Sequence, residues 1–159
     1  MTRRYYEDFE VGQVYVTPSR TVTEVQVAQW AALSGDFNEL HMSEVFAKQS
    51  PFGRRIAHGP VGLAIASGMG NALWEEGGRA ALSLSWQFKA PLVIGDTIHC
   101  EVEVLRKQDT RSHRGGSVDF AVRVINQNNE VVQTGEKSLL FYPRPDSAAV
   151  GTTAARVQE

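Results

Sequence analysis

The residues best suited to chemistry lie between Ser34 and His41, where an acid and an imidazole stand five positions apart. The acid is Asp36, the imidazole is His41, and Asn38 lies between them. A carboxylate and an imidazole can hold one water molecule, with one group accepting its proton while the other orients it. The spacing alone also allows a structural role, in which Asp36 caps a turn and His41 is a hydrogen-bonded loop residue. Asn38 favours a structural role, because Asn readily bonds its own backbone in turns.

A second candidate feature is the sequence His58-Gly59-Pro60, which leads from a loop into a helix of small and apolar residues. The N-terminus of a helix carries unpaired N–H groups and a partial positive charge, so it can polarise a carbonyl group. Pro60 has no N–H, and we therefore expect the Gly59 amide to be the donor. His58 is also available for catalysis, although its position directly before a helix is more typical of a structural residue.

A capping box marks the start of the helix that precedes the acid. Thr23 is the cap, Gln26 follows three residues later, and an apolar face continues at helical spacing through Val27, Trp30 and Ala31. Gly35 is the residue type that ends a helix in the left-handed conformation. We therefore expect Asp36 to lie on a loop that begins at a fixed helix end.

The segment from Pro60 to Glu76 predicts a central helix that is buried on all sides. It carries no charge until its last two residues, and apolar side chains occupy every face. Each interior glycine costs about 1 kcal/mol relative to alanine, so a sheet or a ligand should approach the backbone closely there. Ser67 lies in this helix, and its hydroxyl would either orient the acid–imidazole pair or bond back to its own helix.

The second half of the chain predicts four strands, because apolar and polar residues alternate with a period of two. The strands are expected near residues 82–88, 98–104, 118–124 and 131–142. A long buried helix followed by four antiparallel strands predicts an α+β fold in which a curved antiparallel sheet wraps around a long central helix. Such a sheet leaves long unpaired edges, and a second copy of the chain would cover them. We therefore expect a homodimer.

Composition favours one globular domain over residues 1–145. The chain has 159 residues and a formal net charge of −2, so it offers no basic face for nucleic acid. It has no run of 18 apolar residues for a membrane span, and no apolar stretch behind its N-terminal arginines for a secretory signal. Its single cysteine, Cys100, can form no internal disulfide, which is typical of the reducing cytoplasm. Residues 146–159 offer little apolar area to bury, and we expect a poorly ordered C-terminal tail.

Together these residues and patterns resemble the MaoC-like hot-dog-fold dehydratases, the family of the (R)-specific enoyl-CoA hydratases. The resemblance covers residues from about 8 to 142. It rests on Gly35-Asp36-Phe37-Asn38, Leu40-His41, Phe46-Ala47, Phe52, Ile56, His58-Gly59, Ser67-Gly68, Ala90-Pro91-Leu92 and Gly95-Asp96. Two positions depart from the family pattern: Glu39 stands where the family usually has Pro, and Ser43 where it often has Asp.

The resemblance implies the hot-dog form of the α+β fold and the hydration of a trans-2-enoyl-CoA to a 3-hydroxyacyl-CoA, or the reverse dehydration. In that reaction Asp36 and His41 would activate the water, and the Gly59 amide would polarise the thioester. Asn38 and Ser67 would support this site without touching the substrate. Coenzyme A would enter only as part of the substrate, and no redox cofactor would be needed. No two histidines have the spacing of helical metal ligands, so we expect no metal.

Coenzyme A carries phosphates, and four arginines are candidates to meet them: Arg54, Arg55, Arg111 and Arg114. The alternative is that these arginines are ordinary solvated charges. The two remaining histidines, His99 and His113, are expected to be exposed.

Two other functions stay open at this stage. A hot-dog acyl-CoA thioesterase would deliver water to the carbonyl carbon instead of to C3. A non-catalytic acyl-CoA-binding module would bind the same substrate without chemistry. The acid–imidazole loop disfavours both, most directly the binding module, which needs neither group.

Overall fold

The structure is a computed structural model that describes residues 4–74, 77–110 and 115–145. The predicted tail at 146–159 and the residues Arg111, His113 and Arg114 lie outside the described residues. In chain order the elements are η1 (Tyr6–Asp8), β1 (Val14–Val16), β2 (Arg20–Thr21), α1 (Glu24–Ser34), α2 (Glu39–Met42), α3 (Glu44–Gln49), α4 (Gly59–Asn71), β3 (Gly78–Phe88), β4 (Thr97–Asp109), β5 (Gly116–Ile125) and β6 (Val131–Phe141).

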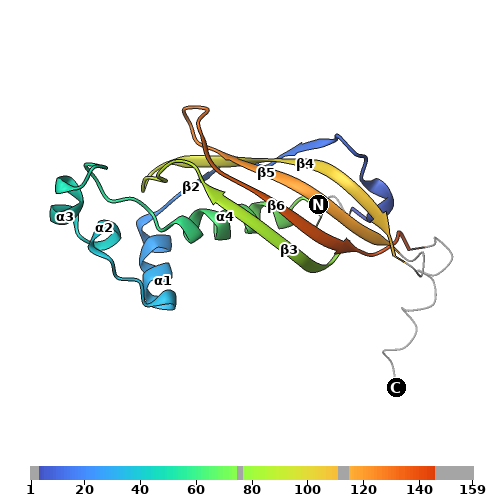
Figure 1. Cartoon of the computed structure of the whole chain (residues 1–159), viewed down its shortest axis with the longest axis horizontal. Helices are drawn as coiled ribbons and strands as arrows, with labels where there is room; N and C mark the ends of the chain where they lie inside the picture. Colours follow the sequence, from blue (N-terminus) through green and yellow to red (C-terminus); the bar gives the residue numbers. More distant parts are fainter. Residues whose placement is uncertain (1–3, 75–76, 111–114, 146–159) are drawn as a thin grey trace, which may run out of the picture.

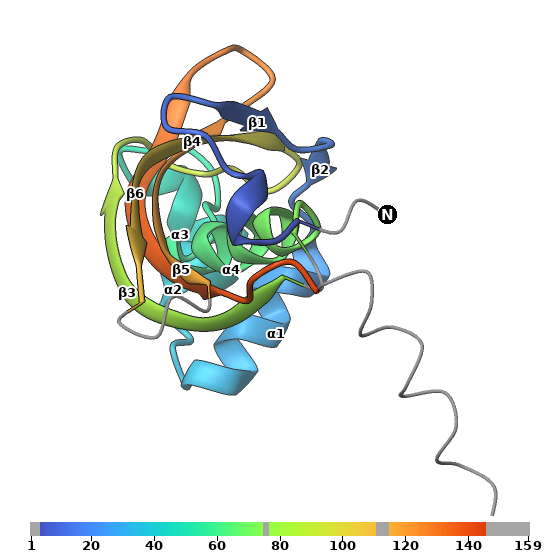
Figure 2. The ribbon, with the colours of Figure 1, turned by 90° about the vertical axis from the view of Figure 1, so that its right-hand side faces the viewer.

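One antiparallel sheet wraps around α4 (Figure 1, Figure 2). Its strand order is β1-β4-β5-β6-β3, and the short β2 pairs with β4. In the middle of the sheet Val122 of β5 lies opposite Val102 of β4 and Gly135 of β6. The helices α1, α2 and α3 gather beyond the N-terminal end of α4 (Figure 1). This arrangement confirms the predicted α+β fold.

The core lies between the concave face of the sheet and one side of α4. Every second residue of β5 points into it, and these residues are buried: Val118, Phe120, Val122 and Val124. An aromatic cluster fills the core near the C-terminal end of α4, where Trp74 stacks on Phe120 with ring centroids 4.9 Å apart. Phe9 and Phe141 pack edge-on against this pair. The C-terminal end of α4 is therefore anchored in the core, and its N-terminal end faces the short helices.

The start and the end of α1 follow the predicted signals. The Thr23 N–H donates to Gln26 Oε1 at 2.8 Å, as in a capping box. Gly35 has a φ of 76° and donates its N–H to the Ala31 carbonyl at 2.9 Å. Only glycine adopts this left-handed conformation without steric cost. Asp36 thus follows a fixed helix end, which confirms that prediction.

The central helix α4 differs from its prediction in length and in burial. It ends at Asn71 rather than near residue 76, and it has an exposed face made of the small residues Ala64, Ser67 and Gly68. The sheet covers only part of the helix, because β3 is an edge strand. The large apolar side chains of β3 are accordingly half exposed: Leu82 (55%), Leu84 (52%) and Phe88 (56%). The expectation of a helix buried on all sides is therefore wrong for the single chain.

Two of the three interior glycines of α4 are closely approached, and both by β6. A Cβ atom on Gly62 would lie 2.4 Å from Gln133 Nε2, and one on Gly70 would lie 2.9 Å from Lys137 Nζ. Gly68 lies on the exposed face, and a Cβ atom there would meet nothing within 4 Å. The close approach predicted from the glycines therefore comes from the sheet at Gly62 and Gly70.

The sequence patterns predict none of the shortest elements, which are η1, β1, β2, α2 and α3. Elements of this size are too short for a periodic pattern to be visible. His99, which we expected to be exposed, is partly buried on β4. Among the described residues, no helix combines the length and the hydropathy that a membrane crossing requires.

Candidate active site

His41 is held in one orientation by two local interactions. It lies in the single turn of α2, whose N-cap Asn38 accepts the Leu40 N–H at 2.9 Å through its side-chain oxygen. His41 Nδ1 lies 2.8 Å from the Ile56 carbonyl oxygen. A carbonyl oxygen can only accept, so the proton of the neutral imidazole is on Nδ1 and the lone pair is on Nε2. Nε2 can therefore accept a proton from water.

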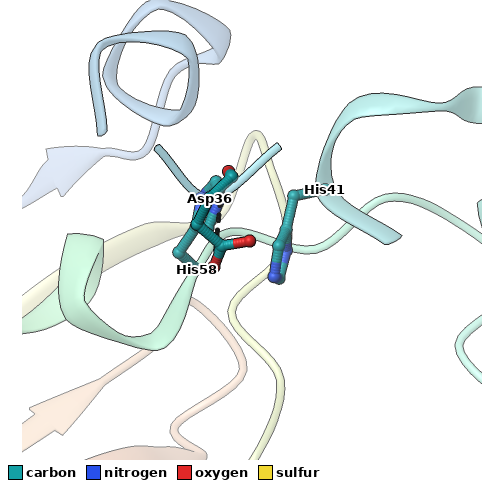
Figure 3. Close-up of side chains that lie close together, drawn as sticks. All are labelled: Asp36, His41 and His58. Carbon is teal, nitrogen blue, oxygen red and sulfur yellow. Dashed lines mark hydrogen bonds and ion pairs between the residues drawn. The ribbon is translucent and has the colours of Figure 1, made fainter. Parts of the chain in front are cut away.

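Asp36 follows the end of α1 and presents a half-exposed carboxylate. Its Oδ1 accepts the Asn38 N–H at 3.2 Å, and its Oδ2 lies 3.9 Å from His58 Nε2. The side chain is 50% exposed. One ligand atom from each of Asp36, His41 and His58 lies within 4.8 Å of the other two (Figure 3). The carboxylate and the His41 ring are thus close enough for one bridging water molecule.

His58 lies beneath the pair and contacts both members. Its side chain is 1% exposed, and its Nε2 donates to the backbone carbonyl of Asp36 at 2.9 Å. Its ring centroid is 3.9 Å from that of His41, with an angle of 32° between the planes. His58 Nδ1 has no hydrogen-bond partner among the described residues. The position of His58 before a helix favoured a structural role, and in the fold His58 contacts the Asp36 backbone and the His41 ring and so holds the two residues together.

Gly59 opens α4 at one wall of a pocket with a volume of about 440 Å³. Its N–H forms no hydrogen bond with any described residue. The pocket is lined mostly by apolar side chains, and the polar side chains in its lining are His41, Lys89 and Gln133. A Cβ atom on Gly59 would lie 2.9 Å from a carbon of the Phe88 ring. The fold therefore brings the predicted donor Gly59 and the predicted base His41 to one pocket.

Ser67 is not part of this pocket in the single chain. It lies eight residues after Gly59 on the exposed face of α4. It forms no hydrogen bond with Asp36, His41 or any other described residue. Within one chain, neither the predicted orienting contact nor the back-bond to the helix is present. The reason is the incomplete burial of α4 described above.

Arg55 is engaged by two carboxylates of the same chain. It donates to both oxygens of Glu24 at 2.7 Å and to Glu44 at 3.1 Å, tying α1 and α3 to the loop before α4. Hydrogen bonding from Arg55 lowers the pKa of Glu24, and hydrogen bonding to Glu24 and Glu44 raises the pKa of Arg55. Arg54 is exposed and forms no hydrogen bond or ion pair with the described residues. Of the two arginines described here, Arg54 is therefore the better placed for a phosphate.

Asp36, His41 and His58 are also the types of residue that bind zinc, and their ligand atoms are close together. The spacing rule used on the sequence could not find this cluster, because its members come from three separate segments. Each imidazole also has one nitrogen on a backbone carbonyl, an arrangement that is common for histidines that bind metals. The geometry is therefore compatible with a metal as well as with proton transfer, and the absence of a metal stays a prediction.

Gln133 is a residue of the pocket that sequence analysis did not single out. It lies on β6, is 1% exposed, and donates from Nε2 to the Gly59 carbonyl at 3.0 Å. The only signal in the sequence is a polar residue at a position of the last strand that faces inward. Such a residue carries no motif, so its role depends on the fold.

Comparison with known proteins gives consistent results. The family model of the MaoC-like domain matches residues 8–128. The chain is 32% identical to a 3-hydroxybutyryl-CoA dehydratase of Methylorubrum extorquens, over 91% of this chain and 87% of that protein. It is also 32% identical to an (R)-specific enoyl-CoA hydratase of Aeromonas caviae, over 82% of this chain and 93% of that protein. The solved structure of an R-hydratase from Pseudomonas aeruginosa in the unliganded form superimposes with a TM-score of 0.77 at 30% identity, over 87% of this chain and 86% of the other.

The predicted family is confirmed by these matches, and so is the fold, since the structural neighbours include hot-dog proteins. His41 and Gly59 line one pocket at the N-terminus of the central helix, and Asp36 lies next to His41 outside the lining of that pocket. The chain therefore belongs to the family of MaoC-like dehydratases, and it is a hydro-lyase with the hot-dog fold.

Proposed function

We propose that this enzyme adds water to a trans-2-enoyl-CoA to give an (R)-3-hydroxyacyl-CoA, or catalyses the reverse dehydration. The observation that carries this proposal is the state of His41. Its Nδ1 is bound to the Ile56 carbonyl, which leaves Nε2 as the free basic nitrogen, while a ring nitrogen of His41 lies within 4.8 Å of the Asp36 carboxylate and His41 lines the same pocket as Gly59. The (R) configuration is supported by the names of the relatives from Aeromonas caviae and Rhodospirillum rubrum.

In the proposed reaction one water molecule lies between Asp36 and His41. His41 Nε2 accepts a proton from this water as the oxygen attacks C3 of the substrate. The electron pair of the double bond moves onto the thioester, and the negative charge on the thioester oxygen is stabilised by the Gly59 N–H. A proton then returns to C2 from the acid–base pair. The net change is the addition of H to C2 and OH to C3.

The helix end is suited to the anionic intermediate. The first N–H groups of α4 have no partners inside the helix, and the helix dipole adds positive potential. The mostly apolar lining of the pocket strengthens this effect, because charges interact more strongly away from water. Coenzyme A is only part of the substrate in this scheme, and neither a redox cofactor nor a metal takes part.

A single assay separates this function from the two alternatives. Crotonyl-CoA is incubated with the protein, and the enoyl thioester absorbance and the release of free thiol are followed together. A hydratase removes the absorbance without releasing thiol. Release of thiol would show a thioesterase, and binding without either change would show a non-catalytic module.

We also propose that the enzyme acts as a homodimer. Among the described residues β3 pairs only with β6, so its outer edge is unpaired, and its side chains Leu82, Leu84 and Phe88 are half exposed. The small residues on the exposed face of α4 would allow a second chain to approach closely. Light scattering at micromolar concentration tests this proposal, and a monomeric mass would contradict it.

A further inference from the structure

The Gln133 side chain lies directly behind the helix end that faces the pocket. Its Nε2 donates to the Gly59 carbonyl at 3.0 Å, and its Oε1 accepts the Trp86 indole N–H at 2.9 Å. The carboxamide is 1% exposed, although it contributes to the pocket lining. A buried amide that has partners on both sides is held rigidly, because rotation would leave them unsatisfied.

The orientation of this amide is determined by its partners. The indole N–H of Trp86 can only donate, so the group that faces it must be the carboxamide oxygen. The Gly59 carbonyl can only accept, so the group that faces it must be the carboxamide NH2. A flipped amide would place two donors against each other at Trp86 and two acceptors at Gly59. Trp86 therefore fixes which face of Gln133 is turned toward the helix end.

Two glycines make room for this arrangement. A Cβ atom on Gly62 would lie 2.4 Å from Gln133 Nε2 and 2.8 Å from its Oε1. A Cβ atom on Gly135 would lie 2.0 Å from a carbon of the Trp86 ring. Neither glycine has a positive φ, so neither is needed for its backbone conformation. Gly62 and Gly135 have no side chain, and the Gln133 and Trp86 side chains occupy the space that a Cβ atom would need.

We propose that Gln133, oriented by Trp86, is a positioning residue that sets the direction of the Gly59 amide toward the thioester oxygen. The inference rests on the proposed function of the Gly59 N–H. Gln133 contacts the Gly59 carbonyl, which is joined to the Gly59 N–H through the Cα atom of the same residue. Gln133 therefore acts through the Gly59 backbone and does not touch the substrate oxygen. Its NH2 group also adds positive potential at a point where negative charge develops during the reaction.

The test compares Gln133→Met with wild type in two measurements. The first is the steady-state rate with crotonyl-CoA. Loss of positioning should lower kcat by about 10- to 100-fold, since small misplacements at a reacting centre have effects of this size, while KM changes little. The second is the infrared carbonyl frequency of bound butyryl-CoA labelled with ¹³C at the thioester carbon. The downward shift on binding should be smaller in Gln133→Met, which a purely structural role would not cause.

Two further variants complete the design. Trp86→Phe keeps Gln133 but removes the donor that orients it, so it should lower kcat and reduce the carbonyl shift as Gln133→Met does. It also provides the test if Gln133→Met fails to fold. Gln127→Met is the matched control. Gln127 also bridges a donor and an acceptor, accepting the Thr97 N–H at 2.9 Å and donating to Asp96 at 2.8 Å, but it lies outside the pocket. It should leave kcat and the carbonyl frequency unchanged.

The outcomes separate this inference from the proposed function. Wild-type kcat and an unchanged carbonyl shift in folded Gln133→Met and Trp86→Phe would overturn the positioning role while hydratase activity stands. A wild-type protein without hydratase activity, whose carbonyl shift still depends on Gln133, would refute the proposed function and support the inference. A wild-type protein that neither hydrates crotonyl-CoA nor shifts the carbonyl frequency would refute both.

Discussion

Both ends of α4 pack against the same strand, β6, but the β6 side chain at one end is neutral and at the other end is a lysine. Near the N-terminal end a neutral amide, Gln133, fits against Gly62 and has both of its polar groups hydrogen-bonded. Near the C-terminal end an ammonium group, Lys137, fits against Gly70, with Nζ 4.5 Å from the centroid of the Trp74 ring. Burial lowers the pKa of Lys137 to about 8, an effect partly offset by Cys100.

The difference follows from the polarity of the helix. The N-terminus carries positive potential, so burying a cation against it would add repulsion, whereas the buried Gln133 amide supplies hydrogen bonds without charge. The C-terminus carries negative potential, and a cation beside an indole ring is tolerated there. The core is closed around the second end and open to a pocket at the first. The N-terminal end of α4 therefore faces the proposed reaction site, and its C-terminal end is packed in the core.

The largest expected effects are at the N-terminal end. Asp36→Asn and His41→Ala should each lower kcat with crotonyl-CoA by at least about 100-fold, the usual range for loss of a general acid or base. The loss of the His41–Ile56 hydrogen bond should cost only about 1 kcal/mol of stability, so the variants should remain folded by circular dichroism. Because both groups act on one water, the double variant should lose less than the product of the single losses.

Lys137→Met provides the comparison for these variants at the other end of α4. It should leave kcat near the wild-type value. Near-normal turnover in folded Asp36→Asn or His41→Ala would contradict the mechanism, and a large loss in Lys137→Met would contradict the division between the two ends.

A smaller effect on turnover is expected from a Gly→Ala substitution, which can be made near each end of α4. Gly62→Ala would put a methyl group against the locked Gln133 amide and should lower kcat by about tenfold, through displacement of the helix end. Gly70→Ala would place its methyl group 2.9 Å from the tip of the flexible Lys137 side chain and at an ordinary contact distance of 3.8 Å from the Trp74 ring. It should leave kcat unchanged and should gain part of the roughly 1 kcal/mol by which alanine exceeds glycine in helix propensity. Equal effects of the two substitutions on turnover would contradict the comparison.

The next effect concerns stability and pH at the C-terminal end. The pKa of Lys137 is about 8 in the folded chain, against 10.5 for an ordinary lysine. Between these values the unfolded state binds more protons, so the free energy of unfolding should rise with pH, by at most about 1.4 kcal/mol per pH unit for one proton. Burial raises the pKa of Cys100 to about 11 from 9.0, which has the opposite effect above pH 9.

The measurement therefore uses urea titrations at pH 8 and pH 9. The wild type should gain stability relative to Lys137→Met over this interval, because the variant has no proton to lose there. A constant difference between the two proteins would show that Lys137 keeps its ordinary pKa.

The smallest expected effect is that of metal removal. Turnover should be unchanged after dialysis against a chelator, because the proposed hydration needs only Asp36, His41 and the Gly59 N–H. Loss of activity on chelation, with recovery on addition of zinc, would show instead that Asp36, His41 and His58 bind a metal. Addition of magnesium in place of zinc is the matched control, since magnesium prefers oxygen ligands.

The sequence by itself determined the features that depend on neighbouring residues. The start of α1 at its capping box, its end at Gly35, and the start of α4 within one residue of the predicted Pro60 all follow from residue types within a few positions. The alternation in residues 98–104 and 118–124 predicted the central strands for the same reason, because a buried face repeats every second residue. The site residues Asp36, His41 and Gly59 could be singled out because each lies at one of these local boundaries or in a recognisable motif.

Only the tertiary structure decided which distant residues meet. His58 lies 22 positions from the Asp36 carbonyl that it binds, and Gln133 lies 74 positions from Gly59. The same is true of Arg55, which is engaged by Glu24 and Glu44, and of Ser67, whose exposure depends on how far the sheet reaches around α4. Hydrogen bonds between such residues carry no periodic signal, because they arise from the packing of a strand, a loop and a helix that are far apart in the chain.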